Sequence, residues 1–525
     1  MSKWERHWPK IALALVLVFV AGVRIRMLSM PLERDEGEFA YAGQLLLQGV
    51  PPYSQCYAMK LPGTYAAYAV MEGIFGQTPS GIHFGAMLVN LGGAILLYRI
   101  ARRFIGSAGA AAAAATHALL TLSPSVYGLA AHASQFVIAS ALGGLLLLCQ
   151  AVETGRARRF FLSGVCFGLA FLMKQPGAMF GIFGVGVLVW MAARDREHWK
   201  TRARQIGWLA LGGAAPVAVT AFALWQAGVF ARFWFWTFTY ARVHGGEIGL
   251  AEGGRRIWYY LSTLADKWLW IAAGASLCVA LFRKAKWRWL ALWFVACSAA
   301  AVSAGLYFTE HYFVMIGPAL GLLVGIGVDQ LNTARDTWIR WMAPVVIAAL
   351  FVTVERRHPL TFFKFTPDQA VQGLYRGNPF LECREIGLRI REDSPANATI
   401  AVIGSEPEIM FYARRKSATG YIYTYDFTER QPYAEAMQRE MTEQVEKARP
   451  EYLIFVRDAY SWYSRKDARN LATLPISQWA LQFAEQYYAP EGLALVRREP
   501  EYFWGKDAFN RPPQPEPLIS IMRRK

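Results

Sequence analysis

The sequence predicts a polytopic α-helical membrane domain followed by a mixed α/β domain outside the membrane. Two observations carry this prediction. Hydrophobic residues make up 54% of the 525 residues and gather into long runs, which soluble domains rarely show. From about Glu355 onward no long apolar run remains, and charged residues and prolines are frequent. We therefore expect a membrane domain over 1–354 and a soluble domain over 355–525.

The first apolar run, at about 11–30, is long enough to cross the hydrocarbon core of a bilayer. It lacks a small-residue cleavage site, so we expect it to remain as the first helix. The basic residues before it, Lys3, Arg6 and Lys10, place the N-terminus in the cytoplasm. Further spans are expected, giving about eleven in all, at 82–101, 108–126, 134–152, 160–173, 177–193, 206–227, 267–282, 288–305, 312–329 and 341–354.

The distribution of basic residues supports this threading, because the clusters between spans all fall on one side. The loops predicted to be cytoplasmic hold the clusters at 102–103, 156–159, 194–204, 283–288 and 335–340. An odd number of spans then places 355–525 on the opposite side, together with the loops 32–80 and 228–265. Both loops contain helical, aromatic-rich patterns that we expect to lie in the membrane interface. The same bias accounts for the net charge of +17 without a nucleic-acid partner.

The C-terminal part has the pattern of a mixed α/β domain. The segments 398–404 and 452–456 are short β-like runs, and an apolar residue every four positions between them predicts a helix with one buried stripe. The sequence shows no dinucleotide fingerprint, P-loop or His/Cys metal motif. Four of the six cysteines lie in apolar runs. Cys56 and Cys383 lie in polar stretches, and the sequence leaves open whether they pair.

The segment after the first span is the richest in chemistry. Asp35 and Glu36 follow that span directly, and Lys60 comes 25 positions after Asp35. An acid at a membrane surface can act as a general base on a hydroxyl, and a lysine can hold a phosphate as a point charge. A structural interpretation competes with this one. Asp35 and Glu38 have the spacing of a capping box that would open a helix ending at Gly49.

Other polar residues stand at the predicted external ends of spans. Lys174 lies between two apolar runs. A charged residue there is either functional, or its side chain simply extends to the membrane interface. Glu310 and His311 occupy a very short external turn, and a lone histidine is more often a packed residue than a metal ligand. Arg24 and Arg26, near the external end of the first span, would either meet a lipid phosphate or extend to the interface.

Several segments resemble a known family. RDEGEFAYAGQLLLQGVPPY and KLPGTYAAYAVMEGIFG resemble the first external loop of bacterial GT-C glycosyltransferases, in the group similar to aminoarabinose transferases and protein O-mannosyltransferases. FLMKQPG and EHYFVMIGP resemble two later segments of that family. The resemblance covers 1–354 and, more weakly, the C-terminal part. It implies a GT-C fold in the bacterial inner membrane, with the reaction on the periplasmic face and the C-terminal domain on the same side.

The resemblance also implies roles for individual residues. Asp35 would be the catalytic acid/base residue, with Glu36 beside it, and Lys60 would contact the donor phosphate. The residues implied to line the substrate cavity are Lys174, Gln175, Glu310, His311 and Tyr312. This chain departs from the family pattern in two places. It has KLPG instead of a double proline, and it has AAHASQF where many relatives carry an acidic residue. No cofactor is therefore assigned, and a divalent metal ion stays open.

The function implied is transfer of a sugar from a lipid-linked donor. Nucleotide sugars are cytoplasmic, so an external transferase needs a donor such as a polyprenyl-phosphate sugar. Asp35 would take the proton of the acceptor hydroxyl in a single displacement with inversion. The acceptor would be lipid A, a surface glycan or a protein. The alternatives are a flippase or transporter, which would more often show internal repeats, and a polymerase or ligase of lipid-linked glycans, which would place its long loop later in the chain.

Overall fold

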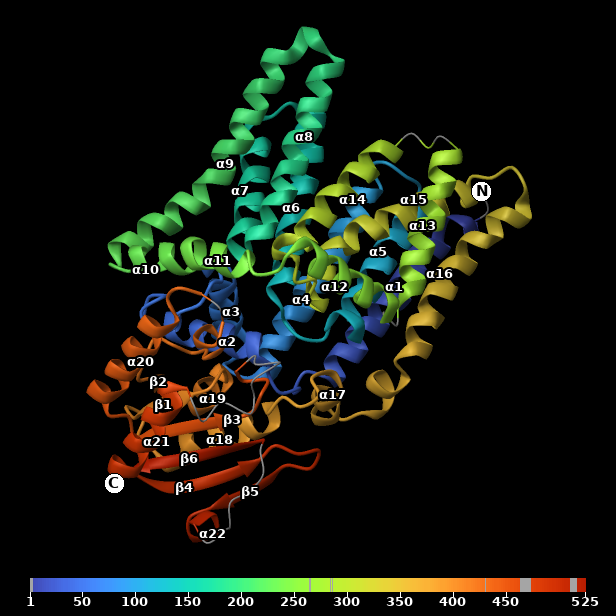
Figure 1. Ribbon diagram of the computed structural model, residues 1–525. Coiled ribbons are helices and arrows are strands. Elements are labelled where there is room, and N and C mark those ends of the chain that lie inside the picture. The colour runs from blue at the N-terminus through green and yellow to red at the C-terminus, as the bar shows by residue number, and fades with distance from the viewer. Residues whose placement is uncertain are drawn as a thin grey trace.

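A computed structural model describes residues 3–263, 266–283, 285, 287–429, 431–462, 474–509 and 517–525. Lys284 and Lys286, which belong to one of the predicted cytoplasmic clusters, lie outside the described residues. Figure 1 shows a bundle of long helices, a domain built around a β-sheet, and a layer of shorter helices where the two meet. The candidate site lies in this layer, so the elements below are described mainly for how they build it.

A helix occupies the position of each predicted span. These are α1 (Lys3–Arg26), α4 (Pro79–Ala101), α5 (Ser107–Leu122), α6 (Ala133–Thr154), α7 (Ala157–Met173), α8 (Ala178–Arg194), α9 (Trp199–Gln226), α13 (Lys267–Phe282), α14 (Arg288–Val302), α15 (Gly317–Asn332) and α16 (Thr337–Arg357). Among the described residues, seven helical segments are long and apolar enough to cross a bilayer, or eight if the bent pair α12 (Leu250–Thr263) and α13 forms one span. The total of eleven spans stays a prediction.

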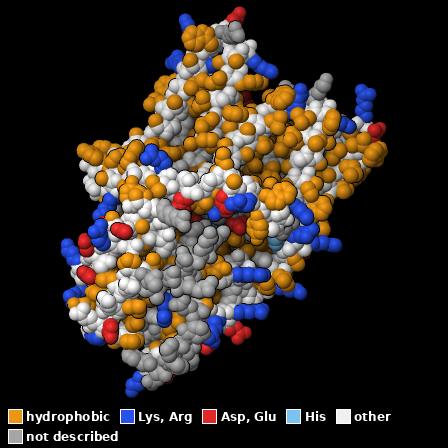
Figure 2. Space-filling view, viewed as in Figure 1, with side chains coloured by type: hydrophobic (Ala, Val, Ile, Leu, Met, Phe, Trp, Pro, Cys, Tyr) orange, Lys and Arg blue, Asp and Glu red, His pale blue; other side chains and the backbone are white. Residues whose placement is uncertain are grey.

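Small residues allow the central helices of the bundle to approach closely. Helix α5 is largely alanine and packs against α15. A Cβ added at Gly321 would lie 2.4 Å from the carbonyl oxygen of Ala113, and one at Gly325 would lie 2.6 Å from that of Gly109. Only glycine fits at such separations, which is how many membrane helices gain packing contacts without a hydrophobic driving force. Large apolar side chains such as Val18 and Val219 remain exposed, and Figure 2 shows apolar side chains covering much of the bundle surface.

The two predicted external loops contain helices and lie on the same side of the bundle as the sheet domain (Figure 1). The first holds α2 (Arg34–Leu47) and α3 (Pro62–Phe75), and the second holds α10 (Phe230–Trp234), a π-helical turn (Phe235–Tyr240), α11 (Ala241–Gly245) and α12. Helix α2 differs from the expected interfacial helix. Its residues from Glu36 to Leu45 are buried, because α2 packs between α3 and the C-terminal domain.

The C-terminal domain is a six-stranded mixed sheet with helices. Its helices are α17 (Pro367–Leu374), α18 (Phe380–Asp393), α19 (Pro407–Ala413), α20 (Ala434–Ala448), α21 (Pro475–Tyr487) and α22 (Lys506–Phe509). Its strands are β1 (Thr399–Ile403), β2 (Lys416–Ser417), β3 (Tyr452–Arg457), β4 (Tyr488–Leu495), β5 (Glu501–Trp504) and β6 (Leu518–Arg524), in the order β2-β1-β3-β6-β4-β5. Strand β1 is parallel to β2 and β3, whereas β6 is antiparallel to β3 and β4. The two predicted strands and the predicted helix, α20, are confirmed.

Short helical turns connect these elements. They are η1 (Pro124–Val126), η2 (Gln175–Gly177), η3 (Arg196–His198), η5 (Ala304–Leu306), η6 (Glu310–Ile316), η7 (Leu360–Lys364) and η8 (Tyr425–Phe427). Turn η2 divides α7 from α8, as the sequence predicts. Cys56 and Cys383 are both buried and free, so they do not form a disulfide with each other.

The C-terminal domain is docked on the first external loop through α2. A Cβ added at Gly37 would lie 2.7 Å from both the Cβ and the backbone nitrogen of Glu408, so the glycine lets α2 touch the start of α19. Arg34 donates from Nε to the Ser405 carbonyl at 2.6 Å and from its terminal nitrogen to Glu406 Oε1 at 3.0 Å. The Ser417 backbone amide donates to the Tyr41 hydroxyl at 2.8 Å. The two parts of the chain are therefore joined by hydrogen bonds and by close packing of α2 on α19.

Candidate active site

The start of α2 sets the direction of the acidic side chains, and the residue that caps it differs from the prediction. The Glu36 amide donates to Glu33 Oε1 at 2.9 Å, and the Glu33 amide donates to Glu36 Oε2 at 3.3 Å, which makes a capping box of Glu33 and Glu36. The predicted box of Asp35 and Glu38 is wrong, because the backbone is still extended at Glu33 and is helical from Arg34. Asp35 lies inside the first turn, and its side chain is free for another role.

Asp35 faces Lys60. The Lys60 Nζ lies 3.0 Å from Asp35 Oδ1 and 4.0 Å from Glu38 Oε2, so one ammonium group lies between two carboxylates. The Tyr53 hydroxyl donates to the Lys60 backbone carbonyl at 2.7 Å and holds the loop that carries the lysine. The structure thus brings together the two residues that the sequence placed at the centre of the site.

Burial and charge determine the protonation of this pair. Burial acts to raise the pKa of the Asp35 carboxyl, but the positive groups around it, Lys60 foremost, lower that pKa to about 2. Burial acts to lower the pKa of the Lys60 ammonium, and the charges of Asp35 and Glu38 outweigh it and raise that pKa above its ordinary value. Both groups are therefore charged at neutral pH, and each stabilises the charge of the other.

Two histidines lie on the other side of Asp35. His132, immediately before α6, has Nδ1 4.0 Å from Asp35 Oδ2, and His311, in η6, has Nε2 3.9 Å from the same oxygen. Their rings are stacked, with centroids 4.1 Å apart. His311 is one of the predicted residues, whereas His132 is not. It stands in AAHASQF, where the family resemblance drew attention to a missing acid and not to the imidazole nearby.

The donor set of Asp35, His132 and His311 is suited to a divalent metal ion. Their ligand atoms all lie within 4.8 Å of one another. Neither ring nitrogen of His132 has a hydrogen-bond partner among the described residues, although both are buried. Burial lowers the pKa of the His132 imidazole to about 4, so the ring is neutral and has a lone pair to offer. His132 therefore supplies a donor close to where the expected acid is missing.

Glu36 is a buried carboxylate that links the start of α2 to the segment before α6. Its Oε1 accepts a hydrogen bond from the Ala131 amide at 2.6 Å and lies 2.9 Å from His83 Nε2. With its Oε2 at the Glu33 amide, both oxygens of this buried carboxylate are engaged. Glu36 fixes the residue directly before His132 to the start of α2. A direct catalytic role for Glu36 stays a prediction.

Lys174 adds a second basic side chain. Its Nζ lies 3.5 Å from the centroid of the Tyr312 ring, a cation–π contact, and burial together with the charge of Lys60 lowers the pKa of its ammonium. Gln175 donates to the Met59 carbonyl at 3.0 Å and so holds the residue before Lys60. Glu310 is half-buried at the start of η6, directly before His311, and its place in the substrate cavity stays a prediction.

Arg24 and Arg26, at the end of the first helix, both donate hydrogen bonds to backbone carbonyls. Arg24 donates to the carbonyls of Thr121 and Gly128, the latter at 2.9 Å. Arg26 donates to the Thr361 carbonyl at 3.1 Å. Both guanidinium groups therefore tie the end of α1 to neighbouring segments, and the structure gives them partners other than a lipid phosphate.

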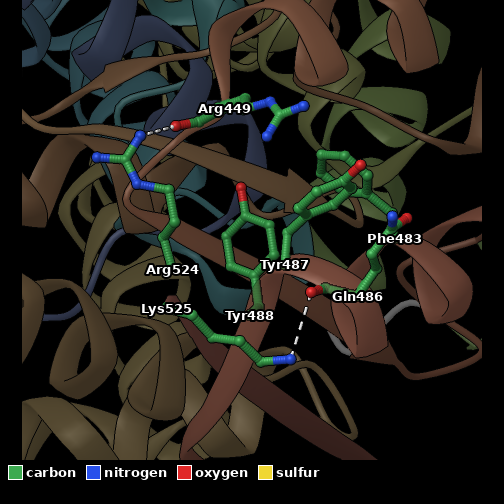
Figure 3. A pocket seen from close by; sticks show the side chains of 7 residues that line it. All are labelled: Arg449, Phe483, Gln486, Tyr487, Tyr488, Arg524 and Lys525. Carbon is green, nitrogen blue, oxygen red and sulfur yellow. Dashed lines mark hydrogen bonds between the residues drawn. The ribbon is translucent and has the colours of Figure 1, made fainter.

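A separate cavity of about 190 Å³ opens in the C-terminal domain, and Figure 3 shows the side chains around it. Its lining comes from α21, β4, β6 and the residues that follow α20 and β6, and includes Arg449, Tyr487 and Lys525. Lys525 Nζ donates to the Glu485 carbonyl at 2.8 Å, and Arg524 donates to the Arg449 carbonyl at 2.6 Å. These cations are already engaged by backbone, and none of the lining residues belongs to the cluster around Asp35.

Comparisons with known proteins bear on this arrangement. Residues 60–237 match the family described as dolichyl-phosphate-mannose-protein mannosyltransferase. The structure is similar to ArnT from Cupriavidus metallidurans bound to undecaprenyl phosphate, with a TM-score of 0.58 at 15% identity over 98% of each chain. It is also similar to the oligosaccharyltransferase AglB from Archaeoglobus fulgidus in complex with an inhibitory peptide and a dolichol-phosphate, with a TM-score of 0.55 at 12% identity over 97% of this chain and 75% of that chain.

A third similar structure is the Archaeoglobus fulgidus oligosaccharyltransferase in complex with Zn and sulfate, with a TM-score of 0.54 at 13% identity over 95% of this chain and 74% of that chain. None of the curated proteins compared with the chain matches it. The family match and the shared fold confirm the resemblance to GT-C glycosyltransferases. They also confirm two predictions, that the protein is a glycosyltransferase and that it is a multi-pass membrane protein.

Proposed function

We propose that the protein transfers a sugar from a polyprenyl-phosphate-linked donor to a hydroxyl acceptor on the periplasmic face of the bacterial inner membrane. The observation that carries this proposal is the contact between Asp35 and Lys60, which sets a base beside a cation where the bundle meets the C-terminal domain. Support comes from the similar ArnT structure, which holds undecaprenyl phosphate, and from the similar AglB structure, which holds a dolichol-phosphate. The acceptor is lipid A, a surface glycan or a protein.

The reaction is a single displacement at the anomeric carbon of the donor sugar. The acceptor oxygen forms a bond to that carbon while the bond to the phosphate oxygen breaks, which inverts the configuration. Lys60 and Lys174 stabilise the negative charge of the departing phosphate. Asp35 accepts the proton of the acceptor hydroxyl. When the phosphate draws Lys60 away, the Asp35 carboxylate loses its nearest countercharge and becomes a stronger base.

A divalent metal ion is compatible with the same site. Asp35, through Oδ2, and the imidazole rings of His132 and His311 would hold it, and Oδ1 of Asp35 would remain on the side of Lys60. Such an ion supplies Lewis-acid stabilisation of negative charge on oxygen. The residues of the chain still bind the phosphate through Lys60, orient the acceptor and take its proton.

The orientation in the membrane can be tested directly. A reporter that is active only outside the cytoplasm should be active when fused after Lys525 and inactive when inserted near Arg202. Both outcomes follow from the positive-inside distribution of basic loops. The opposite pattern would place Asp35 and Lys60 in the cytoplasm and would overturn the periplasmic site.

Transfer itself is tested with the purified protein in detergent, incubated with a panel of radiolabelled polyprenyl-phosphate sugars and with lipid A, glycan and peptide acceptors. We expect label to move from the lipid to an acceptor, with release of polyprenyl phosphate, and we expect Asp35→Asn to abolish this movement. A flippase or transporter moves its substrate between two sides of a membrane and gives no such product in detergent. Label that stays on every lipid would therefore refute the transferase.

A further inference from the structure

The carboxylate of Glu38 receives hydrogen bonds from both parts of the protein. The Tyr65 hydroxyl, from α3, donates to Oε1 at 2.6 Å, and the Tyr423 hydroxyl, from the C-terminal domain, donates to Oε2 at 2.7 Å. The same Oε2 lies 4.0 Å from Lys60 Nζ. Glu38 itself is fully buried. The C-terminal domain thus reaches the Lys60–Asp35 pair through a single intervening carboxylate.

A buried carboxylate stays ionised only if hydrogen bonds and positive charge replace its lost hydration. Burial raises the pKa of Glu38, while Lys60 and the two tyrosine hydroxyls act to lower it. Removing the Tyr423 hydroxyl leaves Oε2 without its hydrogen bond and favours the protonated form. Neutral Glu38 no longer attracts Lys60, whose ammonium would then be held by Asp35 alone.

The backbone next to Tyr423 is hydrogen-bonded to Ser405, which also binds Arg34 of α2. The Thr424 amide donates to Ser405 Oγ at 2.9 Å, and the Ser405 carbonyl accepts the hydrogen bond from Arg34 Nε. The rings of Tyr423 and Tyr425 lie with centroids 4.6 Å apart. Docking of the domain through Arg34 and placement of the Tyr423 hydroxyl are therefore parts of one arrangement.

We propose that Tyr423 is a positioning residue of the active site, supplied by the C-terminal domain, which acts through Glu38 on Lys60. The active site is then complete only when the C-terminal domain is docked on α2. The assignment of Lys60 to the donor phosphate rests on the proposed function, but the action of Tyr423 on Lys60 does not. The titratable groups that lie around Glu38 and interact with its charge or accept or donate hydrogen bonds with it are Asp35, Tyr53, Cys56, Lys60, Tyr65, Tyr423, Tyr425 and Asp426.

Tyr423→Phe removes one hydroxyl and keeps the ring. Tyr41→Phe is the matched control, because the Tyr41 hydroxyl is also buried between α2 and the C-terminal domain but bonds the Ser417 amide, away from Lys60. Glu38→Gln tests the same relay without altering the C-terminal domain. It also keeps the proposal testable if Tyr423→Phe accumulates poorly.

The first readout is independent of sugar transfer. An amine-reactive acylating reagent is applied to the full-length protein between pH 7 and 9, and the acylation of Lys60 is followed by peptide mass spectrometry. The Lys60 amine is held between the carboxylates of Asp35 and Glu38, so loss of the Glu38 charge frees it and should speed acylation of Lys60 severalfold in Tyr423→Phe and in Glu38→Gln. Tyr41→Phe should react as the wild type does. Equal rates in all four proteins would overturn the proposal.

The second readout uses the transfer reaction. For Tyr423→Phe we expect kcat/KM for the donor to fall about tenfold or more, and the acidic limb of its pH profile to move to higher pH, because Glu38 is protonated more easily without Tyr423. Tyr41→Phe should retain the wild-type profile. A wild type that transfers no sugar would refute the proposed function and leave the acylation result standing. An active series in which Tyr423→Phe matches Tyr41→Phe would refute the positioning role.

Discussion

Lys60 Nζ lies 3.0 Å from Asp35 Oδ1, although Asp35 is in the first turn of α2 and Lys60 is in the loop that follows the helix. Both side chains are partly exposed, at 26% and 22%, so the pair can be reached from outside. This ion pair places a base beside a cation. When the donor phosphate binds Lys60, the Asp35 carboxylate becomes free to accept a proton. The predictions that follow test the pair and its surroundings.

Asp35→Asn should fold and accumulate like the wild type and lose transfer activity by about 100-fold or more, because an amide cannot accept the acceptor proton. Asp35→Ala should lose activity similarly and keep its helix, since Glu33 and not Asp35 caps α2. Protein level, melting temperature in detergent and transfer rate check both variants. Activity retained in Asp35→Asn would assign the base to another residue.

Lys60→Ala should use the donor poorly, because the departing phosphate loses its nearest positive charge. Lys60→Arg should keep part of the rate, since the charge remains while its geometry changes. The exposed Lys416, on β2, is the control, and Lys416→Ala should behave like the wild type. The measurement is the donor KM and kcat of the three variants. Normal transfer by Lys60→Ala would show that Lys60 does not stabilise the donor phosphate.

His132→Ala should reduce the binding of a divalent metal ion without unfolding the protein. The three donor atoms lie close enough to share an ion in the wild type. The variant removes the imidazole whose buried nitrogens have no hydrogen-bond partner among the described residues. The metal content of protein loaded with Zn²⁺ and then freed of excess ion is measured by elemental analysis. His198→Ala, at an exposed histidine, serves as the control. Identical metal content in His132→Ala and the wild type would refute the site.

Glu72→Gln should stabilise the protein at neutral pH. Both carboxylate oxygens of this buried residue in α3 are without a hydrogen-bond partner among the described residues, and burial raises its pKa to about 9 from an ordinary value of 4.5. Its neutral form favours the folded state at low pH, and that contribution is lost as the pH rises through about 9. The wild type therefore loses roughly 1 kcal/mol of stability relative to Glu72→Gln for each pH unit between 4.5 and about 9.

Melting temperatures at pH 5 and pH 8 check this prediction for Glu72. The difference between Glu72→Gln and the wild type should be small at pH 5 and should grow at pH 8. Glu443→Gln, at an exposed position of α20, should show no such growth. A difference that stays constant with pH would mean that Glu72 is ionised in the folded protein.

Some features of the site could be predicted from the sequence, and others could not. Asp35 and Lys60 could be singled out because both lie in the first predicted external loop, whose segments resemble those of GT-C glycosyltransferases. Local spacing assigned the helix cap to Asp35 and Glu38. A shift of two residues, to Glu33 and Glu36, preserves the i, i+3 spacing, so the sequence pattern alone does not distinguish the two boxes.

The sequence by itself determined the elements, because apolar run length, the positions of basic loops and the four-residue stripe of α20 are local properties that the chain carries wherever it folds. Only the tertiary structure decided which distant groups meet. His132 reaches Asp35 and His311 because Glu36 binds the amide of Ala131, and Tyr423 reaches Glu38 because Arg34 binds the C-terminal domain. Such contacts join residues nearly one hundred to nearly four hundred positions apart. They depend on how helices and sheet dock, which no local pattern records.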